Sequence, residues 1–230
     1  MITRNSFGQL PTTSIWLTAQ LPVNFSPKLQ WHNDLTYKTM EVSSRAYQRY
    51  YRTGLRYQFS KKWNAVNGIG FFTTNVSTDK THDEYGKEFR IWQEVNYQYS
   101  AKKNLGIQHR FRTEERFYKE TDTKSAFHIL NLTYRLSFTK PIAEKWDLLW
   151  GDEYFEQAYR GKFIFNQNRV ITAAVYTVNK TTQFQGGYIW VLRKTLSQHV
   201  IQLTYRKSIL LYGKKNQKQK PTIPNLPETE

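Results

Sequence analysis

Charged residues occupy alternate positions in the stretch HRFRTEERF, residues 109–117. The charged residues at these alternate positions are Arg110, Arg112, Glu114 and Arg116. A β-strand sends alternate residues to opposite faces, so this spacing places three guanidinium groups and one carboxylate on a single face. Two chemistries fit such a face. One is an anion-selective constriction, and the other is a salt-bridged plug that fills the interior of a small barrel.

Two neighbouring segments show the same alternation and supply further charges. In YQRYYRTGLRYQF and FRIWQEVNYQY, charged and amide residues share one face, and tyrosines and aliphatic residues share the other. An unpaired charge that is shielded from water is costly, so Glu94, Glu114 and Glu153 are the expected counter-ions. Because cations outnumber anions, we predict a water-filled or anion-attracting lumen. The predicted lumen charges on these and later strands are Arg52, Arg56, Arg90, Glu94, Arg110, Arg112, Glu114, Arg116, Arg135 and Glu153.

Catalytic and metal-binding patterns are weaker. A lipid-degrading barrel enzyme needs a serine within hydrogen-bond reach of a histidine that an acid or amide orients. The local groupings of this kind are residues 32–34 (HND) and 197–199 (SQH), and neither offers a suitable nucleophile. No cluster of His, Asp and Glu has the spacing of metal ligands, and residues 81–84 (THDE) are typical of a solvated loop. We therefore predict no enzyme, no metal and no cofactor.

The elements that would position these charges are strands. No helical period stands out, whereas apolar and polar residues alternate along about eleven segments, most of them longer than the usual soluble strand of about 5–6 residues. A tilted strand needs about 9–11 residues to cross a bilayer. The predicted strands are residues 14–21, 29–39, 47–59, 63–74, 89–99, 105–117, 127–138, 146–155, 168–176, 182–192 and 198–212.

The placement of the aromatic residues favours a membrane barrel over a soluble sandwich. Trp63, Tyr97, Tyr99 and Trp146 flank short polar turns, where an interfacial girdle belongs. An arginine on the lipid face near the midplane would cost about 2–4 kcal/mol, so the charges should point inward. Bacterial outer-membrane barrels have even strand numbers. We therefore predict an all-β, antiparallel, up-and-down transmembrane β-barrel of about twelve strands, within a range of 10–12.

Composition is consistent with this fold. The chain has 230 residues, a net charge of +16, 16% aromatic residues and no cysteine, which excludes a disulfide framework. Basic and aromatic residues together also suit a nucleic-acid surface, but here rings and cations fall on opposite faces, whereas a stacking platform needs them together. No nucleic-acid partner is therefore expected. The predicted organisation is an N-terminal segment (1–13), the barrel (14–212) and a disordered basic, Pro-rich tail (213–230).

Three stretches together carry a family resemblance. HRFRTEERF, WGDEYFEQ at 150–157 and FNQNRVITAAVYTVNKTTQFQGGY at 165–188 resemble a family of Gram-negative outer-membrane barrels catalogued as domain of unknown function twenty-four-ninety. The similarity covers roughly residues 16–205. It implies export to the outer membrane and a barrel, and no established activity, so it carries over no catalytic residue. The matching Asn-Arg pair adds Asn168 and Arg169 to the predicted lumen cluster.

Several functions remain open from the sequence. The first is a small pore or ligand-holding barrel with an Arg/Glu-lined lumen. The second is a non-conducting subunit of a larger outer-membrane complex, and the others are a lipid-modifying enzyme and a soluble nucleic-acid-binding barrel. The expected partners are the lipid bilayer and other outer-membrane or periplasmic proteins, which would contact the outer wall, the loops or residues 213–230. Residues 1–10 contain no apolar signal-peptide core, so we expect the export signal to lie outside this numbering.

Overall fold

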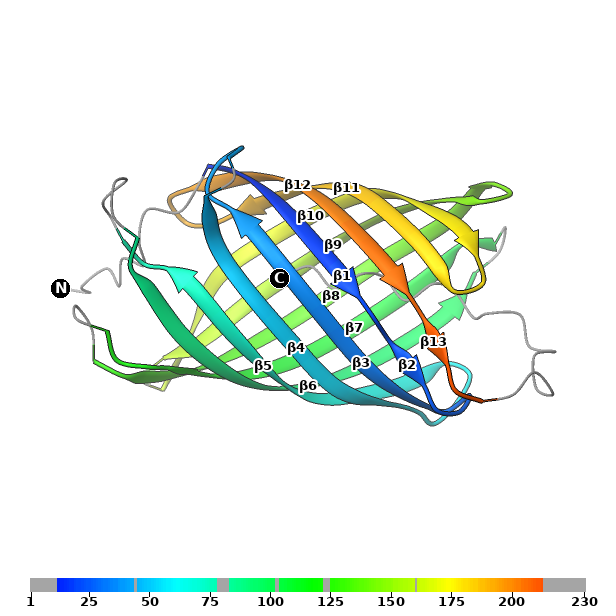
Figure 1. Cartoon of the computed structure of the whole chain (residues 1–230), viewed down its shortest axis with the longest axis horizontal. Coiled ribbons are helices and arrows are strands. Elements are labelled where there is room, and N and C mark those ends of the chain that lie inside the picture. Colours follow the sequence, from blue (N-terminus) through cyan, green and yellow to red (C-terminus); the bar gives the residue numbers. More distant parts are fainter. Residues whose placement is uncertain are drawn as a thin grey trace.

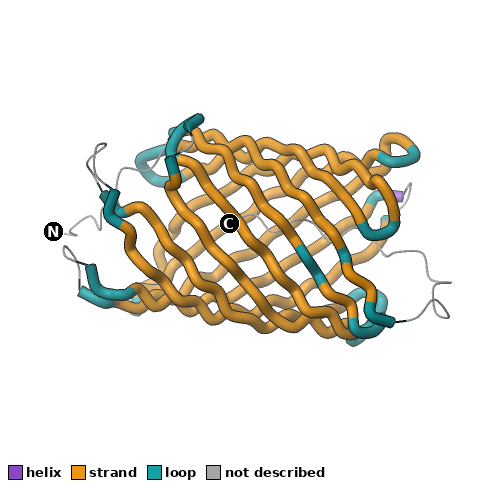
Figure 2. Tube along the Cα trace, in the orientation of Figure 1, coloured by secondary structure: helices purple, strands orange, loops and turns teal. Residues whose placement is uncertain are grey.

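The computed structural model describes residues 12–43, 45–77, 83–101, 104–121, 125–159 and 161–212. Within these ranges the regular structure is β-strand, apart from a short 3-10 segment at Asn104 (Figures 1 and 2). No helix in the same ranges is long and apolar enough to cross a membrane. The predicted tail, residues 213–230, and nearly all of the predicted N-terminal segment lie outside the described residues.

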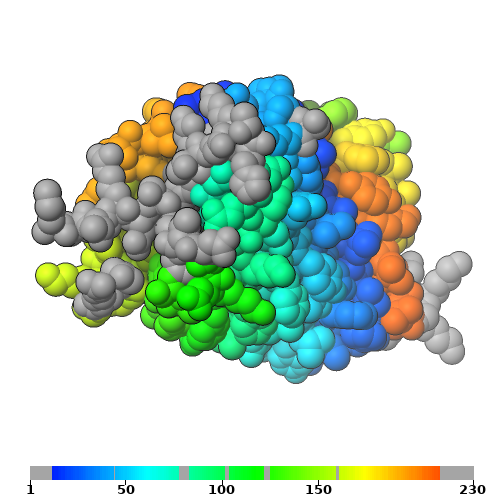
Figure 3. Space-filling view, turned by 60° about the vertical axis from the view of Figure 1, so that its left-hand side comes forward, coloured from blue at the N-terminus to red at the C-terminus, as the bar shows by residue number. Residues whose placement is uncertain are grey.

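The strands follow one another around a closed wall. Their bounds are β1 Thr13–Gln20, β2 Val23–Asn24, β3 Leu29–Thr39, β4 Ala46–Gln58, β5 Trp63–Asn75, β6 Tyr85–Ser100, β7 Gly106–Tyr118, β8 Phe127–Ala143, β9 Trp146–Tyr159, β10 Lys162–Asn179, β11 Thr182–Leu192, β12 Ser197–Lys207 and β13 Ile209–Leu210. From β3 to β12 each strand pairs with the next in antiparallel fashion. In Figure 3 the first strands, in blue, lie beside the last strands, in orange.

The barrel has eleven strands and closes through a parallel pair. β2 continues β1 beyond Pro22, and β13 continues β12 beyond Ser208, so these short strands are extensions. β1 pairs with β12 in parallel and with β3 in antiparallel fashion. In a meander with an odd number of strands the first and last run in the same direction, so the closing pair has to be parallel. Eleven strands lie within the predicted range of 10–12, one below the expected twelve, and the prediction of a purely antiparallel sheet was wrong.

Hairpins at one opening are short, as the sequence indicated. The turns at residues 144–145 and 180–181 contain two residues each. The predicted strands at 146–155 and 168–176 leave residues 156–167 outside any strand, but β9 runs to Tyr159 and β10 begins at Lys162, so this connection is shorter than predicted. The turn contains Gly161, whose φ of 75° lies in the left-handed region that glycine adopts readily.

The two faces of the wall differ sharply in chemistry. Phe111 is 49% exposed and Leu55 is 55% exposed, whereas the neighbouring Arg112 and Arg56 are 2% and 8% exposed. Rings and aliphatic side chains thus cover the outside, and charged side chains fill the inside. This distribution confirms the sidedness predicted from the alternation.

The interior also has an apolar sector on β1 and β9–β12. Residues 170–175 of β10 are apolar on both faces apart from Thr172, and the inner face contributes to this sector. The buried cluster consists of Trp16, Leu149, Ile171, Ala173, Val175, Ile189, Val191 and Val200. The inner wall is therefore divided into an apolar sector and a charged sector.

Candidate functional site

Strands β6 and β7 form the centre of the charged sector. Their register places Glu94 directly opposite Arg112 and Trp92 opposite Glu114. Arg112 donates to Glu94 Oε2 from Nε at 3.0 Å and from Nη2 at 2.7 Å. Its Nη1 lies 3.5 Å from Glu114 Oε1. Directly opposed residues have Cβ atoms about 4.5–5.5 Å apart, so this register brings the inward side chains of each pair together.

A second group lies toward the opening with the longer loops and is centred on Glu88. Arg90 donates from Nε to Glu88 Oε1 at 2.6 Å, and Arg116 donates from its own Nε to the same oxygen at 2.6 Å. Arg90 Nη1 also donates to Glu114 Oε2 at 3.2 Å, which joins this group to the central one. Glu88 was not among the predicted lumen residues, although it shares the parity of Arg90 and Glu94.

A third group joins β3 to β4. Arg52 Nη2 donates to Asp34 Oδ2 at 2.7 Å, and His32 Nε2 lies 2.8 Å from the same oxygen. The register opposes Asp34 to Arg52, and both side chains are almost fully buried. From the sequence, residues 32–34 were considered only as a catalytic grouping, and this ion pair was not predicted. Their shared parity with the arginines was the available signal.

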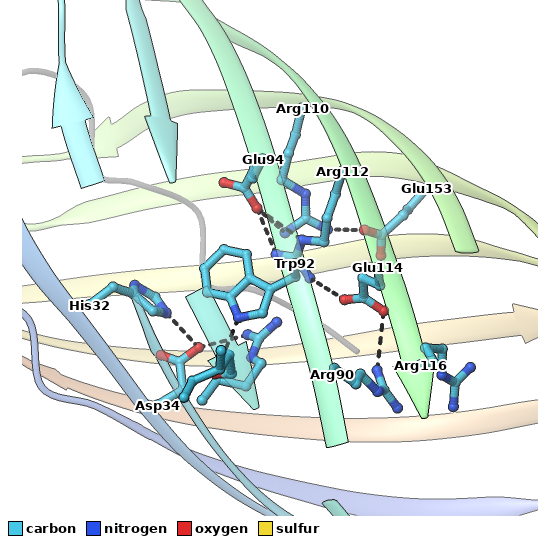
Figure 4. A network of polar contacts seen from close by, with 12 residues as sticks. His32, Asp34, Arg90, Trp92, Glu94, Arg110, Arg112, Glu114, Arg116 and Glu153 are labelled. Atoms are coloured by element: carbon cyan, nitrogen blue, oxygen red, sulfur yellow. Dashed lines mark hydrogen bonds and ion pairs between the residues drawn. The ribbon is translucent and has the colours of Figure 1, made fainter. Parts of the chain in front are cut away.

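Trp92 lies between these groups, as Figure 4 shows. Its ring is edge-on to His32, with centroids 5.7 Å apart, and the guanidinium carbons of Arg52 and Arg112 lie 5.5 and 5.4 Å from its centroid. Gly68 is directly opposite Trp92, and a Cβ on Gly68 would lie 2.8 Å from the indole ring. Glycine is therefore required for this large side chain to pack against the inner wall.

A further row of charges crosses four strands, from β7 to β10. The register opposes Arg110 to Arg135, Arg135 to Glu153, and Glu153 to Arg169. Arg110 Nη2 donates to Glu153 Oε1, and Arg169 Nη1 lies 3.6 Å from Glu153 Oε2. Arg169 also stacks over Phe155, with 4.4 Å between its guanidinium carbon and the ring centroid. One carboxylate therefore lies among several guanidinium groups.

The structure places eleven of the twelve predicted lumen residues on the inner face. Arg116 lies nearer to an opening than the others, with 15% of its side chain exposed. Asn168 is the exception, because it lies on the outer face and donates from Nδ2 to Asp152 Oδ2 at 2.8 Å. Asn168 and Arg169 are adjacent in one strand and must face opposite sides, so including both in the lumen was wrong. The ten residues buried inside are Arg52, Arg56, Arg90, Glu94, Arg110, Arg112, Glu114, Arg135, Glu153 and Arg169.

The rim with the longer loops carries a separate ion pair. Arg45 Nε donates to Asp83 Oδ1 at 2.8 Å, and Asn75 Nδ2 donates to the same oxygen at 2.6 Å. The hydrogen bond from Arg45 lowers the pKa of Asp83 below its ordinary value. This contact ties the end of β5 to the loop segments that precede β4 and β6.

The interior arrangement can seal the barrel and can bind an anion. Arg52, Arg110, Arg112, Arg135 and Glu153 are almost completely buried, each at most 2% exposed. Side chains that line an open aqueous channel would be accessible to water. Among the described residues, no group of three or more His, Asp or Glu side chains could hold a metal ion.

One family comparison matches the barrel. The sequence profile of a family described as protein of unknown function (DUF2490) matches residues 13–200. The chain belongs to this family. The match begins at the first residue of β1 and ends within β12, so family membership covers nearly the whole wall and confirms the resemblance. A search of the curated proteins found no match.

Proposed function

We propose that this protein is an outer-membrane β-barrel that holds a ligand in a charge-filled interior closed to continuous flow. The observation that carries the proposal is the sidedness of the wall. The outer face exposes large apolar residues on every main strand, including Leu35 at 60% and Phe71 at 52%. Contiguous apolar surface on this scale is rare in monomeric soluble proteins and suits hydrocarbon.

Ring contacts on the outer wall support a membrane position. Interfacial aromatic girdles are expected at two heights of a membrane barrel, one near each opening. The series nearer the short turns has ring centroids 4.6 Å apart for Trp63–Tyr97, 5.4 Å for Tyr97–Tyr99 and 6.2 Å for Tyr99–His109. The series nearer the longer loops has 5.5 Å for Phe71–Phe89, 6.1 Å for Phe89–Phe117 and 4.6 Å for Phe117–His128.

The closed interior favours a ligand-holding barrel over a conducting pore. The ion pairs around Glu94 and Glu153 and the ring of Trp92 lie on the inner wall, and these three residues are at most 2% exposed. An open pore would require these pairs to separate. The nucleic-acid alternative is disfavoured because its cations would have to reach a surface, and the predicted arginine cluster is buried. No catalytic role is part of the proposal.

Cell fractionation of the full precursor tests the location. We expect the protein in the outer-membrane fraction, released by detergent but not by high salt or alkaline carbonate. Recovery in the soluble fraction would refute the membrane proposal. Planar-bilayer recordings test the closed interior: we expect no steady conductance from the parent chain, and openings in a variant that lacks both Glu94 and Glu153. Steady conductance of the parent would refute closure.

A second candidate is a non-conducting subunit of a larger membrane assembly, favoured by the polar pair on the outer wall. Asp152 is exposed near the middle of β9, between Leu136 and Val170 on the neighbouring strands. A carboxylate in this position suits a protein contact better than lipid. Mild detergent extraction followed by sizing tests this candidate. Asp152→Asn should release any bound subunit, and the control Glu156→Gln, on the same face of β9, should not. A monomeric parent chain argues against it.

A further inference from the structure

The interior of the barrel carries more positive than negative charge. Among the buried side chains of the described ranges, eight are cationic and five are acidic. Arginine stays protonated at any physiological pH, so burial cannot neutralise the excess. The cationic side chains are those of Lys38, Arg52, Arg56, Arg90, Arg110, Arg112, Arg135 and Arg169, and the acidic ones are those of Asp34, Glu88, Glu94, Glu114 and Glu153. Burying uncompensated charges is strongly unfavourable, so a counter-ion is required.

The excess is most concentrated in the row from β7 to β10. Arg110 and Arg135 are directly opposed, and like charges in that relationship destabilise a sheet. Glu153 is the carboxylate of this row, and it already interacts with both Arg110 and Arg169. One carboxylate cannot balance three guanidinium groups. The strongest positive potential inside the barrel is therefore expected here.

Buried donors near this row have no hydrogen-bond acceptor. Arg110 Nε and Nη1 are buried without one, and Nη1 is 3.7 Å from Glu94 Oε2, beyond hydrogen-bond distance. Arg56 Nε is buried without an acceptor as well, and its guanidinium forms no ion pair with the described part of the chain. Arg56 is paired with Val66 on β5, which is paired in turn with Glu94 on β6, so Arg56 lies level with Glu94 two strands away. Buried unsatisfied donors commonly mark the place of a water or an ion, and only an ion offsets the charge.

We propose that the barrel interior binds a tetrahedral oxyanion, of the phosphate type, against Arg110 and Arg135, with Arg56 contributing to the positive potential. Guanidinium groups bind phosphate through paired, charge-assisted hydrogen bonds, and orphaned Arg110 donors are available for them. The phosphate group has two sources, which are free inorganic phosphate and the headgroup of an anionic lipid. The inference rests on the ligand-holding part of the proposed function and not on membrane location, so a negative titration and a negative fractionation result can be told apart.

A refolding titration tests the site. The full chain is unfolded in urea and refolded into neutral detergent micelles without phosphate, with ionic strength held constant by chloride. Its melting temperature is then followed as inorganic phosphate is added in one arm and phosphatidylglycerol in the other. We expect a saturable rise, because a ligand that binds only the folded state stabilises it. A rise in the phosphate arm identifies free phosphate, and a rise in the lipid arm alone identifies a headgroup. No rise in either arm overturns the proposal.

Three variants locate the site. Arg110→Gln should raise the ligand concentration at half-effect by about tenfold, the loss expected for one charge-assisted hydrogen bond. Arg56→Gln breaks no described ion pair, so it should fold, melt no lower than the parent without ligand, and need more ligand for half-effect. Arg49→Gln is the control, because Arg49 is exposed on the outer wall beside Tyr85. If all three variants respond to ligand as the parent does, the proposal is wrong.

Discussion

Replacing Glu153 with glutamine should weaken the barrel far more than any comparable change on its outer wall. The Glu153 carboxylate is fully buried, accepts a hydrogen bond from Arg110 and lies 3.6 Å from Arg169. The amide keeps the shape but removes the negative charge from a row that already has excess positive charge. Removing one partner of a buried ion pair costs about 3–5 kcal/mol. For a chain of this size, roughly 2–4 °C per kcal/mol gives a fall in melting temperature of roughly 6–20 °C.

Urea unfolding in phosphatidylcholine vesicles, followed by gel mobility of folded and unfolded forms, measures this cost. Glu156→Gln is the matched control, because Glu156 lies on the outer face of the same strand and accepts only an exposed hydrogen bond from Tyr154. Its cost should stay below about 1 kcal/mol. Adding Arg110→Gln to Glu153→Gln should recover part of the loss, because it removes a charge left without its partner. Equal costs for Glu153→Gln and Glu156→Gln would refute the view that this row is electrostatically coupled.

Three further predictions concern the packing, the rim and the seam. Gly68→Ala should destabilise the barrel by roughly 1–3 kcal/mol in the same assay, because its Cβ would clash with the Thr53 carbonyl oxygen and would lie 2.8 Å from the Trp92 ring. Gly186→Ala, with its nearest atom at 3.8 Å, should be close to neutral, and equal effects would contradict the packing. Arg45 lowers the pKa of Asp83 in the folded state, so the contact between them is fully present above the ordinary aspartate pKa and is lost as the pH falls through the lowered pKa of the folded protein. NMR titration of Asp83 should show a midpoint below the ordinary aspartate pKa, and Arg45→Ala should raise that midpoint. Leu17→Cys with Leu203→Cys should form a disulfide on oxidation, because these residues are register partners in the parallel β1–β12 pair and the chain has no cysteine of its own. The control pair, Leu17→Cys with Phe71→Cys, should not cross-link. An absence of cross-linking between positions 17 and 203 would contradict the parallel closure.

The sequence was sufficient to predict which face each strand turns inward. Phe111 and Arg112 differ by one position, and the period of two places one outside and the other inside. The same rule should have excluded Asn168 once Arg169 was placed inside. The expected number of strands was twelve instead of the observed eleven for a different reason. The eleven segments were visible, but the even-number regularity of bacterial barrels was given more weight than the segments themselves.

The partners inside the barrel could not be predicted as readily. The contact of Arg52 with Asp34 depends on the register of β3 against β4, which becomes known only when the hairpin is built. The position of Trp92 depends on its alignment with Gly68. Gly68 allows this close packing, because a Cβ at that position would lie 2.8 Å from the indole ring. Parity identifies the inward residues, but register decides which of them meet.

Spin labels on the outer wall test the central claim most directly, because the natural chain offers no cysteine to interfere. Phe111→Cys and Leu132→Cys place labels on the outer face of β7 and β8, and Glu144→Cys places one in a short turn. Paramagnetic relaxation by oxygen and by a water-soluble nickel chelate would be compared in outer membranes isolated from cells. The account predicts high oxygen and low nickel accessibility at positions 111 and 132, and high nickel accessibility at 144. High nickel accessibility at 111 and 132 would show that the apolar wall faces water and would contradict the membrane barrel.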